Sequence, residues 1–184
     1  MKNKLLIFKD KDINLIDTIC ILILIMVISG IIGFIYETIF YKIDLGYFTK
    51  RGSSFGPWVP IYGFGGLLLT IFTYKFKKNP LIVLMLSLFI TGLLEYFTGY
   101  FLFIFKGIRL WDYNNELLNF GNINGFICLR SVLLFGISGL ILNYILIPKI
   151  IKITNNIFKK KLTIFSFIIG FIYISDLILY GILN

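Results

Sequence analysis

Residues 13–41, INLIDTICILILIMVISGIIGFIYETIFY, decide the fold, because they form a nearly unbroken apolar stretch of 29 residues. A helix rises about 1.5 Å per residue, so about 20 apolar residues cross the roughly 30 Å hydrocarbon core of a bilayer. Four more apolar stretches follow, at residues 57–74, 80–105, 123–147 and 162–183. The sequence therefore predicts an all-α, polytopic membrane helix bundle with about five transmembrane spans.

The composition of the chain agrees with a membrane location. Of its 184 residues, 58% are hydrophobic and 15% are charged, and the mean hydropathy is +0.91. Soluble domains have roughly 45–50% apolar and about 25% charged residues, so the apolar excess must face lipid. We expect residues 1–184 to form a single integral membrane domain that opens with a basic arm at residues 1–12.

The second stretch, residues 57–74, differs from the others. Prolines and glycines crowd its first half, at Pro57, Pro60, Gly63, Gly65 and Gly66. Only its second half has the pattern of an ordinary helix. Non-helical backbone is tolerated at membrane depth where protein surrounds it. We therefore predict that the second span is broken or partly re-entrant.

Positive charge sets the expected orientation, because loops rich in lysine and arginine stay in the cytoplasm. Twelve such residues lie in the N-terminal arm and in residues 75–79 and 148–161, against five in the loops on the other side. We expect a multi-pass protein of the cytoplasmic membrane, with its N-terminus inside and its C-terminus outside. The net charge of +9 then suits the anionic surface of the lipid bilayer, and we expect no nucleic-acid partner.

Four ionisable side chains fall inside the predicted spans: Glu37, Glu95, Arg130 and Asp176. In the expected orientation all four lie in the outer half of the bilayer. Charges at this depth are costly, so they face the bundle and pair with one another or mark a substrate or ion pathway. One base cannot balance three acids, which leaves protonation, a bound cation, or Lys50 or Arg51 reaching in from a loop. The group is thus either a binding site or a structural ion pair that fixes helix register.

Two segments on the outer side complete the candidate site. Residues 50–66 combine cations, glycines, prolines and interfacial aromatics, which suits either a re-entrant loop that lines a cavity or a loop with an aromatic belt. The second segment begins at residues 111–113. Its Asp112 could cap a short helix, or pair with Arg51 or Arg109. The candidate substrate- or ion-binding residues are Glu37, Glu95, Arg130, Asp176, Arg51, Tyr62, Trp111 and Asp112.

The sequence gives no indication of an enzyme. It contains no histidine, which excludes catalytic and metal-binding schemes that need an imidazole. The string GISG at residues 136–139 matches intramembrane serine proteases, but those enzymes need a histidine to activate the serine. No G-x-x-x-x-G-K-[ST] phosphate loop is present either. We expect no catalytic residues, no metal and no cofactor.

Several motifs in order resemble one family. They are GFIYE at residues 33–37, the segment 51–65, LEYFTG at 94–99, WDY at 111–113 and NFG at 119–121. Together, from about residue 30 to 147, they resemble the bacterial membrane-protein family described as putative ABC transporter type IV, or putative ABC transporter permease. Members often have tryptophan where this chain has Phe34 and Phe135.

This resemblance implies a permease subunit that works with a separate ATPase or another membrane subunit. Residues 75–79 are too short to present a coupling helix, so only residues 148–161 could contact an ATPase. We therefore expect a membrane permease or transporter subunit with a polar site in the outer half of the membrane. The alternative is a non-transporting scaffold or accessory subunit whose buried charges are structural.

The charge asymmetry makes the topology testable. A reporter that is active only in the cytoplasm should work when fused to the N-terminus or within residues 153–159, and should fail after Asn184, because twelve positive charges hold the first two places inside. Reporter activity at both termini would contradict this orientation and would indicate an even number of spans.

Overall fold

The computed structural model describes residues 7–8, 13–154 and 159–183. In these ranges it is helical and has no strand, apart from one isolated bridge between Ile123 and Ile127. The α-helices are α1 (Leu15–Leu45), α2 (Pro60–Thr73), α3 (Pro80–Lys106), α4 (Leu129–Ile141), α5 (Ile147–Thr154) and α6 (Lys159–Leu183). A 3₁₀ turn at Tyr74–Phe76 follows α2, and a π-helical turn at Leu142–Leu146 joins α4 to α5. The all-α prediction is confirmed.

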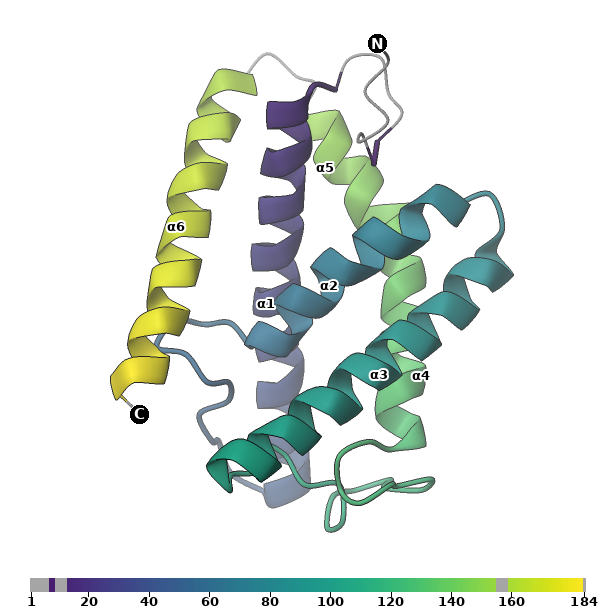
Figure 1. Ribbon diagram of the computed structural model, residues 1–184, viewed down its shortest axis with the longest axis vertical. Coiled ribbons are helices and arrows are strands. Elements are labelled where there is room, and N and C mark those ends of the chain that lie inside the picture. The colour runs from purple at the N-terminus through teal and green to yellow at the C-terminus, as the bar shows by residue number, and fades with distance from the viewer. Residues whose placement is uncertain (1–6, 9–12, 155–158, 184) are drawn as a thin grey trace.

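Four helical segments in the described ranges are long and apolar enough to cross a membrane: Leu15–Leu45, Pro80–Lys106, Leu129–Thr154 and Lys160–Leu183. Figure 1 shows α1 along the length of the molecule, with α6 on one side of it and α4 and α5 on the other. Helices α2 and α3 cross in front, where α2 packs against α1 and α3 packs against α4. Helix α1 is thus the central element, in contact with α2, α5 and α6.

The predicted second span is broken, as its prolines suggested. Helix α2 has only 14 residues, or about 21 Å, which is shorter than the hydrocarbon core. It begins at mid-height beside α1 and rises toward the end where α1 begins (Figure 1). Residues 46–59, which lead from α1 into α2, contain no helix. The break ends at Pro60, so the three glycines of this segment are helical, contrary to the expectation that they would interrupt the helix.

These glycines allow close approach between helices. A Cβ atom on Gly66 would lie 2.3 Å from Ser29 Oγ of α1, and one on Gly63 would lie 2.2 Å from Tyr173 Oη of α6. Transmembrane helices use small residues at such contacts because lipid supplies no hydrophobic force between helices. The glycines of α2 therefore serve packing and leave the helix intact.

The fourth span differs from its predicted bounds. Its helix begins at Leu129 and not at residue 123, because Asn124 and Gly125 adopt positive φ and the chain turns there. The helix then continues through Pro148 to Thr154. Proline clashes with the carbonyl four residues earlier, and the π-helical turn just before it opens the helix at that point. The last helix begins at Lys159, three residues before the predicted start.

Asp176 of α6 satisfies the non-helical backbone of the broken span. Its Oδ1 accepts a hydrogen bond from the Phe55 N–H (3.1 Å). Its Oδ2 accepts from the Gly56 N–H (3.1 Å) and from Trp58 Nε1 (2.7 Å). The Val59 N–H donates to the carbonyl of Gly30 in α1 (3.0 Å). The unwound stretch is thus held between α1 and α6 by groups that replace water.

Replacing Asp176 by asparagine should destabilise the protein. The amide has one acceptor oxygen and turns its NH₂ group toward a donor, so a partly buried N–H loses its partner, which costs up to about 3 kcal/mol. We expect Asp176→Asn to lower the melting temperature in detergent. Asp112→Asn, in an exposed loop, is the matched control and should shift stability by less than about 0.5 kcal/mol. Equal melting temperatures for the two variants would contradict the role assigned to Asp176.

Candidate functional site

A small polar cavity lies at the end of the molecule opposite the start of α1. Its volume is about 30 Å³, which is enough for a water molecule. Helices α1, α2, α3 and α4 and the loop between α3 and α4 contribute its walls. We call it the polar chamber; its polar lining residues are Tyr36, Glu37, Tyr41, Tyr62, Glu95, Trp111, Tyr113, Glu116, Arg130 and Ser131.

Glu95 of α3 is the most deeply buried acid of the chamber, with 3% of its surface exposed. Its Oε1 accepts a hydrogen bond from the Tyr113 hydroxyl, and its Oε2 lies 2.7 Å from Ser131 Oγ. Burial and the neighbouring Glu95 raise the pKa of Tyr113 well above its usual range, so this phenol stays a neutral donor. In the part of the chain that the structure describes, no lysine or arginine forms an ion pair with Glu95.

The Ser131 hydroxyl has two close oxygen neighbours but only one hydrogen to donate. Its Oγ lies 2.7 Å from Glu95 Oε2 and 2.8 Å from the carbonyl oxygen of Cys128. A serine hydroxyl carries one hydrogen, and a carbonyl can only accept. If Ser131 donates to Cys128, the remaining contact is a hydrogen bond only when the Glu95 carboxyl carries the proton.

Two ion pairs flank Glu95. Arg51, from the non-helical stretch before α2, donates through Nε to Glu37 Oε2 of α1 (3.1 Å). Arg130, in the first turn of α4, donates through Nη2 to Glu116 Oε2 in the loop (2.7 Å). The first pair follows the expectation that Arg51 could reach in. The second pairs Arg130 with a loop acid, whereas we expected an acid inside the spans.

Both pairs are further held by their surroundings. Arg130 Nη1 donates to the carbonyl of Leu117 (2.9 Å), and the Tyr41 hydroxyl donates to Glu116. The Arg51 guanidinium lies 3.5 Å from the centroid of the Tyr41 ring. Two arginines thus balance two of the three chamber acids, which leaves Glu95 as the acid without a cation.

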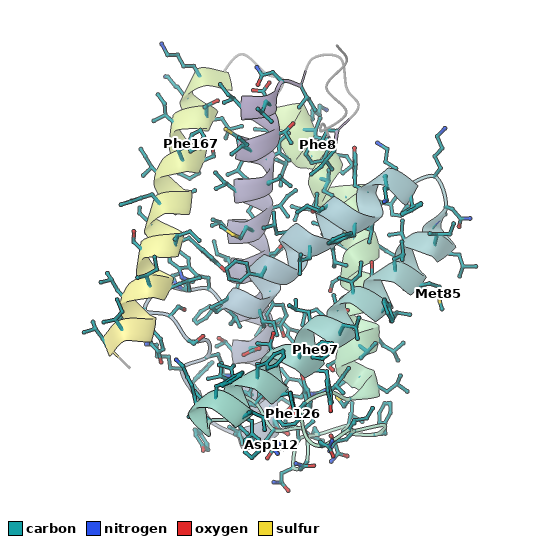
Figure 2. All side chains as sticks on the ribbon, in the orientation of Figure 1. Phe8, Met85, Phe97, Asp112, Phe126 and Phe167 are labelled. Carbon is teal, nitrogen blue, oxygen red and sulfur yellow. The ribbon has the colours of Figure 1, made fainter. Side chains whose placement is uncertain are left out.

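The structure brings together most of the predicted candidate residues. Glu37, Glu95, Arg130, Tyr62 and Trp111 line the chamber, and Arg51 reaches it through Glu37. It does not bring the two aspartates there. Asp176 holds residues 55–58, as described above. Asp112 lies in the exposed loop, as Figure 2 shows, where it contacts Arg109 at 3.5 Å and Asn114 at 2.6 Å.

Sequence reasoning missed five polar chamber residues: Tyr36, Tyr41, Tyr113, Glu116 and Ser131. Three acids and one base inside the spans left protonation, a bound cation or entry of loop charges as alternatives, and Lys50 and Arg51 were named for the last of these. This excess of acids over bases could not have indicated Glu116, because a further acid makes the excess larger. Its role depends on the fold of residues 107–128, which brings Glu116 to Arg130.

Two larger cavities border the chamber. One, of about 430 Å³, shares Glu37, Ile61 and Trp111 with it. The other, of about 280 Å³ and mainly apolar, shares Tyr36, Tyr62 and Phe135 among its residues. The chamber therefore shares parts of its wall with both larger cavities. Among the described residues, no group of three or more Cys, Asp or Glu side chains is placed to hold a metal ion.

The chain was compared with known protein families, curated proteins and solved structures. The model of the family described as putative ABC-transporter type IV matches residues 23–180. No curated protein and no solved structure matches. The matched range covers more than four fifths of the chain and contains every residue of the chamber. The chain therefore belongs to the putative ABC-transporter type IV family.

Proposed function

We propose that this chain is a permease or transporter subunit, and that the polar chamber is its substrate or ion site with Glu95 as the proton-carrying group. One observation carries the proposal. Glu95 is a buried carboxyl whose hydrogen-bond partners are neutral, and no cation of the described chain pairs with it. A carboxyl at membrane depth without a cation is a functional candidate because its charge is costly there.

The proton count of the chamber supports a neutral Glu95 at rest. The two arginines and the carboxylates of Glu37 and Glu116 cancel, so an ionised Glu95 would leave one uncompensated negative charge. A protonated Glu95 donates to Ser131 Oγ, and Ser131 then donates to the carbonyl of Cys128, so both short contacts become hydrogen bonds. Release of this proton would create the charge that attracts a cation or a cationic substrate.

The cavities around the chamber support a binding site over a purely structural cluster. A structural ion pair gains stability from close packing, yet cavities of about 430 Å³ and about 280 Å³ lie beside the chamber and share lining residues with it. These lie within or near the usual size of ligand sites, roughly 300–1,000 Å³. We infer that a ligand or ion can approach Glu95 from at least one of them.

A partner subunit would contact the opposite end of the molecule. There α5 presents Lys149 and Lys152 to the surface, while the turn between α2 and α3 is short. Part of the predicted contact region 148–161 lies outside the described residues, at residues 155–158. We infer that a separate ATPase or another membrane subunit would contact α5 and the start of α6.

A second candidate function is a membrane scaffold or accessory subunit. Each arginine pair ties a non-helical segment to a helix: Arg51 joins residues 46–59 to α1, and Arg130 joins residues 107–128 to α4. This arrangement is what a structural role for the charges requires. The two functions differ in what they predict for Glu95, which belongs to neither of these two ion pairs.

Replacing Glu95 by glutamine separates the two functions. The amide NH₂ can donate to Ser131 and the amide oxygen can accept from Tyr113, so the variant should keep the melting temperature of the native protein. As a contrast, Arg130→Leu breaks a partly buried pair and should lower stability by up to about 3–5 kcal/mol, the cost of breaking a fully buried one. In a strain that lacks the native gene, the solutes that accumulate in cells and medium are compared after expression of each form. The native gene should restore the native solute profile and Glu95→Gln should not.

Equal restoration by Glu95→Gln and the native gene would favour the scaffold, because the proton-carrying group would then be dispensable. A loss of stability in Glu95→Gln as large as that in Arg130→Leu would also contradict the proposal, since it would make Glu95 an ionised structural partner.

A further inference from the structure

The larger cavity beside the chamber has a charged mouth and an apolar continuation. We call it the vestibule. Its polar end, which we call the mouth, is lined by Lys50, Arg51, Gly52 and Ser53, with Tyr180 of α6 beside Lys50. Its inner wall is apolar, from Phe64 of α2 to Leu94 and Leu102 of α3. The vestibule thus has distinct polar and apolar parts.

The mouth of the vestibule carries an excess of positive charge. Lys50 is exposed and forms no ion pair within the described residues; its ammonium lies 5.5 Å from the Phe55 ring and 5.4 Å from the Tyr180 ring. Arg51 uses only its Nε on Glu37. Glu37 is the one acid among the residues that line the vestibule. One anionic group at this mouth would balance the remaining charge.

An open groove continues from the vestibule along α2 and α3. It has a volume of about 430 Å³ and shares Leu94 and Thr98 with the vestibule. The rest of its lining is apolar and includes Phe72, Ile90 and Phe97, and Figure 2 shows Phe97 on the outer surface of α3. We call it the α2–α3 groove.

The length of the apolar path suits one leaflet of a bilayer. From Leu102 in the vestibule to Ile90 in the groove, helix α3 rises about 18 Å. Half of a hydrocarbon core is about 15 Å thick. When the headgroup of a lipid lies at the mouth, one of its acyl chains can therefore extend along the groove.

We propose that the vestibule and the α2–α3 groove bind an anionic phospholipid, with its phosphate at Lys50 and Arg51 and an acyl chain along α3. A soluble anion would use the mouth but would leave the apolar wall without a partner. A zwitterionic lipid would bring a cation to a mouth whose only acid already pairs with Arg51. The proposal concerns a lipid site and holds whether or not Glu95 takes part in transport.

The test uses brominated lipids, which quench tryptophan fluorescence on contact. Trp111 lines the vestibule, whereas Trp58 is 6% exposed. The purified full chain in detergent micelles is titrated with brominated phosphatidylglycerol, and in parallel with brominated phosphatidylcholine. Saturable quenching by phosphatidylglycerol is expected, with at least about tenfold weaker binding of phosphatidylcholine. Trp111→Phe should remove the saturable component.

Matched variants separate the mouth and the groove from the general surface. Lys50→Gln should raise the Kd for phosphatidylglycerol about fivefold, the loss expected for one lysine at an anionic lipid surface. Lys106 is an exposed lysine at the C-terminal end of α3 and lies outside the vestibule. Lys106→Gln should therefore change this Kd less than twofold. Thr98→Phe fills the shared part of the path and should weaken binding, while Ile104→Phe on an exposed part of α3 should not.

Free glycerol phosphate distinguishes a lipid from a soluble anion. It should not displace brominated phosphatidylglycerol at equal concentration, because it lacks the chain that occupies the groove. Displacement by glycerol phosphate would overturn the proposal in favour of a soluble-anion site. Equal quenching by the two lipids, or equal effects of Lys50→Gln and Lys106→Gln, would overturn it in favour of nonspecific lipid contact. The comparisons of lipids and of glycerol phosphate need no variant, so a folding defect cannot obscure them.

Discussion

The hydrocarbon interior of a bilayer cannot hydrate polar groups, and this constraint accounts for the arrangement of the whole molecule. A polar group there needs a partner inside the protein, or its exposure costs several kcal/mol. The chain between α1 and α3 is non-helical in its first half. The backbone of that half depends on Asp176 of α6 and on the carbonyl of Gly30. Without those partners α2 could not begin at mid-height, and the walls of the polar chamber would not meet.

The same constraint assigns different roles to the buried charges. Glu37 and Glu116 each meet an arginine, and Asp176 meets backbone N–H groups and an indole. Glu95 meets only hydroxyl groups. Among the described residues, Glu95 is therefore the chamber acid that no arginine balances. That difference connects the structure of this member of the putative ABC-transporter type IV family to the transport role proposed for it.

The sequence predicted the fold class and half of the polar chamber residues, and its errors have physical causes. Hydropathy located the long helices because lipid selects apolar residues over whole helical lengths. It placed the fourth helix too early because residues 123 and 126–128 are apolar, whereas the chain turns at Asn124 and Gly125 between them. The prediction grouped Asp176 with the other acids because it used only their expected depth in the membrane. In the structure Asp176 faces residues 55–58. Glu116 was missed because only the folded loop brings it to Arg130.

Infrared spectroscopy of the purified protein tests most directly whether Glu95 is a neutral acid. A protonated carboxyl has a C=O stretching band separate from those of carboxylates and of the amide backbone. The account predicts such a band at neutral pH in the native protein and in the control Asp112→Asn, and its loss in Glu95→Gln. If native protein and Glu95→Gln give the same spectrum in this region, Glu95 is ionised and the central claim is wrong.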